Sequence, residues 1–160
     1  MGRNGARRSA RGLRMRFTSV TRQVLDDSGR LTIPAKARRW FSKEAFVTPS
    51  RDGKCLYLYN EELWDIVAKR ASELPATDDV ATAVKLRVGA MTEECHVDAQ
   101  GRVLIPEELR RLAGIQKEVV LAGAIDKLTL WNPERWAEAR ARIFEDPDID
   151  DYMREKNVVL

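Results

Sequence analysis

The sequence predicts a mixed α/β fold in which two tandem ββαββα pseudo-repeats form one double-hairpin domain. Three observations predict it: a turn motif that occurs twice, short apolar stretches on both sides of each turn, and amphipathic helical stretches after each strand pair. The motif copies read Asp26-Asp27-Ser28-Gly29-Arg30-Leu31-Thr32-Ile33-Pro34 and Asp98-Ala99-Gln100-Gly101-Arg102-Val103-Leu104-Ile105-Pro106. Asp26, Gly29, Arg30, Ile33, Pro34 and Arg38 recur as Asp98, Gly101, Arg102, Ile105, Pro106 and Arg110, always 72 positions later. A fixed spacing over six identities indicates a duplicated unit.

Each motif copy is typical of a strand, a tight turn and a second strand. The leading Asp can accept hydrogen bonds from backbone N–H groups further along the turn, and Gly takes a positive φ at no steric cost. Proline at position 34 or 106 then suits the first position of a helix, where its missing N–H costs nothing. We therefore expect a β-hairpin leading into a short helix in each unit, with one Arg at the turn and another on the helix.

The rest of the chain fits two units. The first repeat, residues 15–75, is expected to contain strands 17–25 and 31–33, a helix over 34–41, strands 45–48 and 55–59, and a helix over 60–74 that Asn60 caps. The second, residues 76–145, is expected to contain a helix over 78–91, strands 94–97 and 103–105, a helix over 106–113, strands 119–122 and 127–131, and a helix over 132–144. Residues 146–160 are expected to form a flexible tail.

Residues 1–14 are predicted to be a disordered basic extension, because they contain five arginines, no acid and almost nothing to bury. A DNA-contacting arm and translation from an upstream start are both open interpretations. The whole chain carries a formal charge of +3, so residues 15–160 carry −2 without these arginines. Overall charge therefore gives no argument for DNA binding. No apolar run is long enough for a membrane span, and no hydrophobic segment follows the basic start, so we expect a cytoplasmic protein.

Catalytic, metal and cofactor sites are not expected. The chain has two cysteines, Cys55 and Cys95, and one histidine, His96, whereas a structural zinc site takes four such ligands. Both cysteines are interpreted as small apolar strand residues. No glycine-rich phosphate loop or nucleophile elbow is present, which argues against an enzyme.

The doubled motif resembles the MraZ family, which belongs to the AbrB-like swapped-hairpin superfamily of DNA-binding proteins. Matching stretches also occur at 86–90, 120–124 and 130–136, and the resemblance covers about residues 15–144. Family members typically begin near Met15. The resemblance implies a sequence-specific transcriptional regulator that forms a ring, binds short G-containing direct repeats of double-stranded DNA in its own promoter, and autoregulates a division and cell-wall gene cluster at the nucleoid. A ring-forming protein-interaction scaffold and an antitoxin-like module, each with incidental nucleic-acid binding, remain alternatives.

The candidate DNA-reading residues are Arg30 and Arg102, because an Arg at a turn can present its planar fork to a phosphate or a guanine. The alternative is that each Arg only locks the turn by pairing with its motif carboxylate. The resemblance favours both roles together, with Asp26, Gly29, Asp98 and Gly101 orienting the arginines. Lys36, Arg38 and Arg39 are candidate phosphate contacts; the alternative is a solvated helix face.

The two copies are not equivalent. Glu107 and Glu108 stand in the helix of the second copy, and acids repel phosphate, so the first unit is expected to dominate DNA binding. Ser28 stands where the family commonly has Lys, which predicts low affinity per subunit and a need for several linked contacts. Four tryptophans are candidates for either the core or an assembly interface: Trp40, Trp64, Trp131 and Trp136.

Overall fold

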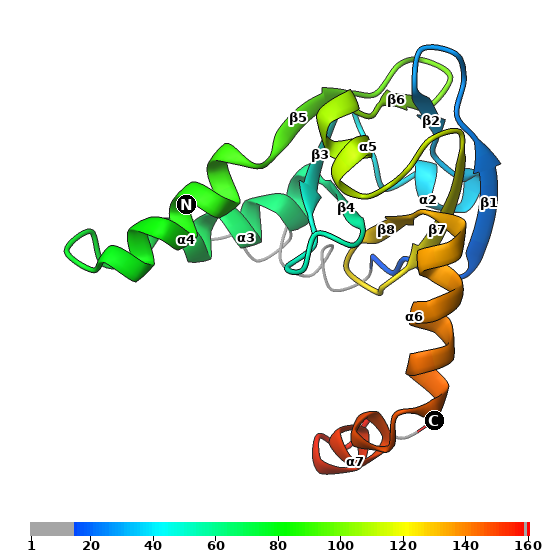
Figure 1. The fold of residues 1–160 in the computed structure, drawn as a ribbon. Coiled ribbons are helices and arrows are strands. Elements are labelled where there is room, and N and C mark those ends of the chain that lie inside the picture. Colours follow the sequence, from blue (N-terminus) through cyan, green and yellow to red (C-terminus); the bar gives the residue numbers. More distant parts are fainter. Residues whose placement is uncertain (1–14, 159) are drawn as a thin grey trace.

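The structure, a computed structural model, describes residues 15–158 and 160 (Figure 1). The predicted basic extension over residues 1–14 lies outside the described residues. The first unit contains β1 (Val20–Val24), β2 (Arg30–Thr32), α2 (Ala35–Arg38), β3 (Glu44–Pro49), β4 (Leu56–Asn60) and α3 (Glu61–Ser72). After α4 (Asp79–Ala90), the second contains β5 (Glu93–His96), β6 (Arg102–Leu104), α5 (Glu107–Leu112), β7 (Glu118–Gly123), β8 (Leu128–Trp131) and α6 (Pro133–Glu145), followed by α7 (Pro147–Glu155). The predicted mixed α/β fold with two ββαββα units is confirmed.

The two units interleave their strands. The larger sheet has six strands in the order β1-β7-β8-β4-β3-β5, so that a strand of one unit lies beside strands of the other at both ends. Strands β2 and β6 form a separate two-stranded sheet. All pairings are antiparallel. Neither unit therefore has a complete sheet of its own.

The two strands on either side of the first motif turn do not pair with each other, and each pairs with a strand of the second unit instead. The expected turn is present, since the N–H of Gly29 donates to the Asp26 carbonyl at 2.9 Å. The strands on its two sides separate, however: β1 pairs with β7, and β2 pairs with β6. Oε1 of Gln23 in β1 accepts from the N–H of Thr32 at 3.1 Å, and its Nε2 donates to the Thr32 carbonyl at 2.5 Å. This side chain therefore links β1 to β2 where no backbone pairing does.

One hydrophobic core is built from residues of both units and of both sheets. Leu31 and Ile33 of the first motif are fully buried, and so are their duplicates Val103 and Ile105. They pack in one cluster with residues of the larger sheet such as Leu58, Leu121 and Leu130. Because burial of apolar surface drives folding, this shared core holds the two motif turns in a fixed relation.

The longer helices begin where their capping residues predict. The Asn60 side chain accepts a hydrogen bond from the N–H of Leu63 at 2.9 Å, at the start of α3. Asn132 accepts from the N–H groups of Glu134 and Arg135 before α6, at 2.8 and 3.1 Å. The first motif helix is shorter than the predicted 34–41, because only Ala35–Arg38 is helical. The pair α3 and α4 projects from the body (Figure 1).

The predicted flexible tail over residues 146–160 needs correction, because Pro147–Glu155 forms helix α7. Asp146 caps it by accepting from the N–H of Asp148 at 3.1 Å, and the proline occupies its first position. The acidic composition concealed this start signal. Helix α6 leads away from the body and α7 turns at its end (Figure 1). This arm exposes Phe144 and Tyr152, at 78% and 62%.

The tryptophans divide between buried and half-buried positions. Trp64 is a core residue, stacked on Phe46 with ring centroids 5.4 Å apart. Trp131 and Trp136 are half-buried and contact each other with centroids 5.7 Å apart, and Trp40 is half-buried against the core. No tryptophan is therefore among the large exposed apolar side chains of the described chain.

Candidate nucleic-acid interface

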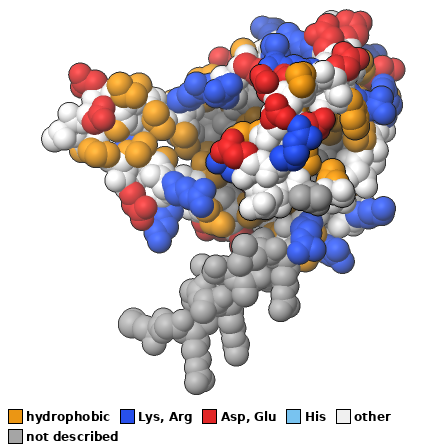
Figure 2. Space-filling view, turned by 90° about the horizontal axis from the view of Figure 1, so that it is seen from below, with side chains coloured by type: hydrophobic (Ala, Val, Ile, Leu, Met, Phe, Trp, Pro, Cys, Tyr) orange, Lys and Arg blue, Asp and Glu red, His pale blue; other side chains and the backbone are white. Residues whose placement is uncertain are grey.

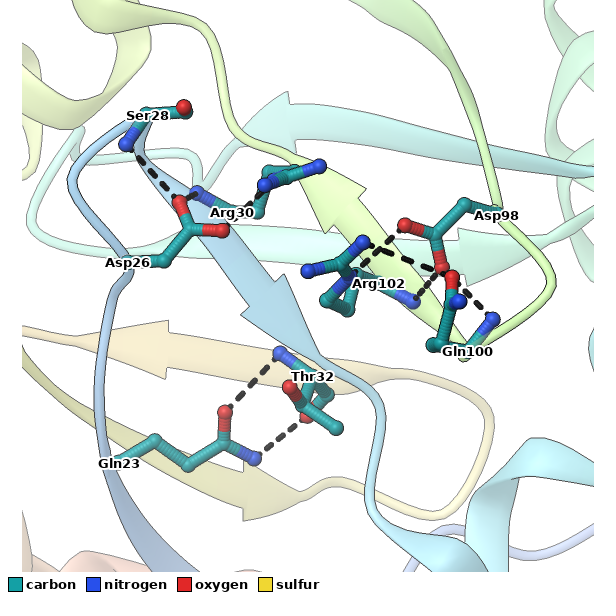
Figure 3. A network of polar contacts seen from close by, with 8 residues as sticks. All are labelled: Gln23, Asp26, Ser28, Arg30, Thr32, Asp98, Gln100 and Arg102. Carbon is teal, nitrogen blue, oxygen red and sulfur yellow. Dashed lines mark hydrogen bonds and ion pairs between the residues drawn. The ribbon is translucent and has the colours of Figure 1, made fainter.

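The strands that follow the two motif turns form one antiparallel ribbon, β2–β6 (Figure 3). Its register places Arg30 opposite Leu104 and Thr32 opposite Arg102. The central residue of each strand is fully buried. Because successive side chains of a strand point to opposite faces, the four flanking residues share the outward face of the ribbon. The fold thus brings the two predicted turn arginines onto one surface.

In the first turn, Asp26 binds the backbone and the side chain of the motif arginine together. Its Oδ1 accepts from the N–H of Ser28 at 3.0 Å and from the N–H of Arg30 at 2.9 Å. Its Oδ2 accepts from Nε of Arg30 at 2.6 Å. Gly29 completes the turn with a φ of +86°, in the region that favours glycine. The carboxylate therefore fixes both the turn and the direction of the guanidinium.

The second turn repeats this geometry (Figure 3). Oδ1 of Asp98 accepts from the N–H groups of Gln100 and Arg102, both at 2.9 Å, and Oδ2 accepts from Nε of Arg102 at 2.9 Å. Gly101 has a φ of +74°. The second turn adds a long contact of 3.5 Å from Nη2 of Arg102 to Oε1 of Gln100. Two turns in different units thus hold their arginines in the same way.

These bonds favour the ionised carboxylates. The backbone N–H of Arg30 above all, and then its side chain, lower the pKa of Asp26 below the ordinary value of 3.8, against an opposing effect of burial. The backbone N–H and side chain of Arg102 lower the pKa of Asp98 in the same way. Both carboxylates are therefore charged at neutral pH, and each can hold its arginine.

The pairing with aspartate leaves most of each guanidinium available. Within the described residues, Arg30 donates to its carboxylate only through Nε, which leaves four of the five guanidinium N–H bonds of this side chain free. The side chains of Arg30 and Arg102 are 37% and 34% exposed. The alternative that each Arg pairs with its own Asp is thus confirmed as a contact, and the contact leaves the outer fork free to bind an acceptor.

Sequence reasoning missed two residues of this surface, Thr32 and Leu104. They alternate with the buried central residues of β2 and β6, and Leu104 is 51% exposed. The period of two around a buried residue would have placed both outward. Gln23, which anchors Thr32, carries no comparable signal in the sequence.

The helix cations lie in two different settings. Lys36 and Arg39 of the first unit are exposed, and the guanidinium of Arg39 lies 4.7 Å from the Trp40 ring centroid. In the second unit, Glu107 binds Arg111 at 2.6 Å, which offsets one of its cations. Arg38 lies next to the turn of the second unit instead of standing apart on its helix. Among the described residues, the motif helix of the first unit thus carries more positive charge that no carboxylate offsets than that of the second.

Other candidate chemistry is sparse in the described chain. Residues 15–158 and 160 hold no group of three or more His, Cys, Asp or Glu side chains arranged for a metal ion. Cys55 and Cys95 are buried and free, and burial raises the pKa of each thiol to about 11, which agrees with their interpretation as small apolar residues. None of the described helices is both long enough and apolar enough for a bilayer span.

Comparison with known proteins gives consistent matches over almost the whole chain. The family model described as "MraZ protein, putative antitoxin-like" matches residues 17–87 and 90–157. A protein of Saccharopolyspora erythraea named Transcriptional regulator MraZ is 39% identical over 144 residues, covering 90% of this chain and 96% of that protein. Proteins of the same name from Thermomicrobium roseum and Mycobacterium ulcerans are 37% and 40% identical, covering 84% and 76% of this chain and 92% and 85% of their own lengths.

Proposed function

The chain belongs to the MraZ family, and we propose that it is a DNA-binding transcriptional regulator, the role that its relatives' name states. One observation carries the proposal. Two turn arginines from different units, each oriented by its own aspartate, share the outward face of a single β-ribbon. Two-stranded ribbons fit the major groove of DNA, where side chains can reach base edges.

The spacing of the two arginines suits a short DNA sequence. Arg30 and Arg102 are diagonal neighbours in the ribbon. Cα atoms in such positions lie about 7–8 Å apart, and base pairs rise about 3.4 Å each along DNA, so the pair spans about two base-pair steps. A guanidinium with free Nη donors binds O6 and N7 of guanine bidentately. The ribbon is therefore suited to two nearby guanines.

Phosphate contacts would come mainly from the first unit. Lys36 and Arg39 of the first unit are exposed, whereas Glu107 and Glu108 occupy the helix of the second unit. Acidic groups repel the DNA backbone, and cations that neutralise phosphates supply most of the non-specific affinity. The first unit would thus dominate backbone binding, and both units would contribute one base-reading arginine.

The finer part of the proposal is a ring of subunits that binds several direct repeats in its own promoter and autoregulates a division and cell-wall gene cluster at the nucleoid. Assembly needs apolar surface, and Val80, Leu86 and Phe144 are exposed at 72%, 62% and 78%. Figure 2 shows hydrophobic side chains gathered on the projecting end of the α3–α4 pair, at the left. Linked weak sites gain affinity through effective concentration, which suits repeated short operators.

The test is fluorescence anisotropy with DNA from upstream of the protein's own gene, against scrambled DNA of equal length and at two salt concentrations. We expect Arg30→Ala and Arg102→Ala each to weaken binding to the natural DNA by about tenfold or more, the range for loss of a bidentate base contact. Arg70→Ala on α3 removes the same charge away from the ribbon and should change little. Equal binding of natural and scrambled DNA by the wild type would refute the regulator and favour the scaffold.

A further inference from the structure

Arg38 on α2 and Arg110 on α5 each reach the motif turn of the opposite unit. A Cβ on Gly29 would lie 2.7 Å from Nη2 and 2.8 Å from Cζ of Arg110. A Cβ on Gly101 would lie against the guanidinium of Arg38, with Cζ at 2.9 Å. These spacings are too short for a real Cβ, so glycine leaves the room that each guanidinium occupies. The two contacts are related by the internal duplication.

Hydrogen bonds through Ile33 fix the position of the Arg38 guanidinium beside Gly101. Nη2 of Arg38 donates to the carbonyl of Ile33 in its own unit, at 3.2 Å. The N–H of the same Ile33 donates across the ribbon to the carbonyl of Gly101, at 2.8 Å. Arg38 thus spans from the end of β2 to the residue immediately before Arg102.

The Arg110 contact has the same construction. Nε of Arg110 donates to the carbonyl of Ile105 at 2.9 Å. The N–H of Ile105 donates to the carbonyl of Gly29 at 3.1 Å. Arg110 therefore rests on the residue immediately before Arg30. Each of the two motif turns is therefore hydrogen-bonded to its own unit's aspartate and contacted at its glycine by an arginine of the other unit.

We infer that Arg38 and Arg110 are positioning residues, each of which holds the DNA-reading turn of the opposite repeat. The inference rests on the proposed DNA-binding function and changes the predicted role of Arg38, which sequence reasoning grouped with phosphate contacts. Arg110 is the deciding comparison. It follows two glutamates on its helix, where a phosphate contact is unfavourable, and it still makes the same contact as Arg38. The shared feature of the two arginines is the opposite turn.

Lysine can separate the two roles at these positions. A lysine keeps the positive charge for a phosphate, but its single ammonium lacks the planar fork that covers a glycine while donating to a carbonyl. Arg39→Lys is the matched control, because Arg39 is the next residue along and contacts Trp40 instead of a turn. Arg38 is exposed and Arg110 is half-buried, so we expect lysine at either position to leave the fold intact.

The first measurement is amide hydrogen exchange by NMR on the full chain without DNA. The N–H groups of Gly101 and Arg102 both donate to Asp98, so they report on the second turn. Arg38→Lys should speed their exchange about fivefold or more and leave Gly29 and Arg30 unchanged, as a local opening affects only its own region. Arg110→Lys should give the reverse pattern, and Arg39→Lys neither. Unchanged exchange in both turns, or a change in a variant's own turn, overturns the inference.

The second measurement is a double-mutant cycle on DNA affinity. Arg38→Lys should weaken binding about tenfold in the wild-type background and less than about twofold in Arg102→Ala, because coupled residues are not additive. In Arg30→Ala, the same change should keep its full effect. Full additivity with Arg102→Ala overturns the inference. If neither Arg30→Ala nor Arg102→Ala weakens binding, the proposed function fails, and the exchange result still decides the cross-repeat contact.

Discussion

At the scale of residues, the two motif carboxylates are the parts of the turns that titrate. Their folded-state pKa values lie below the ordinary 3.8, so their contribution to turn stability is complete above that pH and is lost as the pH falls through the lower folded-state value. NMR titration of the side-chain carboxyl carbons should therefore give midpoints below 3.8 for Asp26 and Asp98. Arg30→Ala should raise the midpoint of Asp26 only in part, because the backbone N–H of residue 30 remains, and should leave Asp98 unchanged.

The orienting role of the carboxylate can be tested with an adjacent control. Asp26→Asn removes a negative charge, which by itself favours DNA, but it also places an amide against Nε of Arg30 and breaks the pairing. We expect DNA affinity to fall about tenfold, which lies within the range of about 1–3 kcal/mol for a good base contact. Asp27→Asn removes the same charge from an exposed neighbour, and we expect affinity to stay level or rise slightly. Anisotropy on both variants checks the pair; a rise in affinity with Asp26→Asn contradicts the role.

The six duplicated identities show how far residue patterns reach. The sequence placed Asp26, Gly29 and Arg30 in one turn correctly, because all three act within a few residues of each other. It could not show that the guanidinium of Arg110 also lies against Gly29, because the two residues belong to different units and are far apart in the sequence. A contact within one turn can be predicted from the spacing of its residues, whereas a contact between the two units cannot.

At the scale of elements, strand positions were predictable and strand partners were not. Alternation, turn residues and caps located every strand and the longer helices to within a few residues. Antiparallel partners depend on which arrangement buries the most apolar surface, and that is a property of both units together. Helix α7 was missed for a different reason: its Asp-Pro start was masked by a run of acidic residues.

Interleaving predicts that one unit cannot fold alone. Fragment 15–75 lacks β7, the partner of β1, and β6, the partner of β2. Its core residues Leu31 and Ile33 would lose their counterparts from the second motif. We expect the isolated fragment to give a poorly dispersed NMR spectrum at concentrations where it is monomeric, and mixing with fragment 76–160 to restore dispersion. A well-dispersed spectrum from monomeric 15–75 would contradict this expectation.

At the scale of the whole molecule, the ribbon and the exposed apolar surfaces lie on different parts of the fold. The β2–β6 ribbon sits at one end of the body, whereas the α3–α4 pair and the α6–α7 arm project away from it (Figure 1). Subunits could therefore contact one another through the projections while their ribbons stay free. This separation lets assembly and DNA contact be changed independently.

Val80 on α4 is the sharpest site for that test. It is 72% exposed, so a charged replacement costs the isolated chain little, whereas a charge buried in an interface without a partner is costly. We expect Val80→Glu to lower the mass measured by light scattering after gel filtration, with an unchanged circular dichroism spectrum. Thr82→Glu adds the same charge on the opposite side of this helix, about 200° around it, and should keep the wild-type mass.

The same variant connects assembly to DNA binding. A dissociated subunit keeps its ribbon, so Val80→Glu should retain a weak, Arg30-dependent affinity for DNA with one site. It should lose the gain that wild type shows on DNA with several repeats, because that gain comes from linked sites and can reach 10²-fold or more. If Val80→Glu keeps the wild-type mass, α4 is not the assembly surface. If it dissociates but still gains from repeated sites, binding to repeats does not depend on the oligomer, and the proposed reason for the ring is wrong.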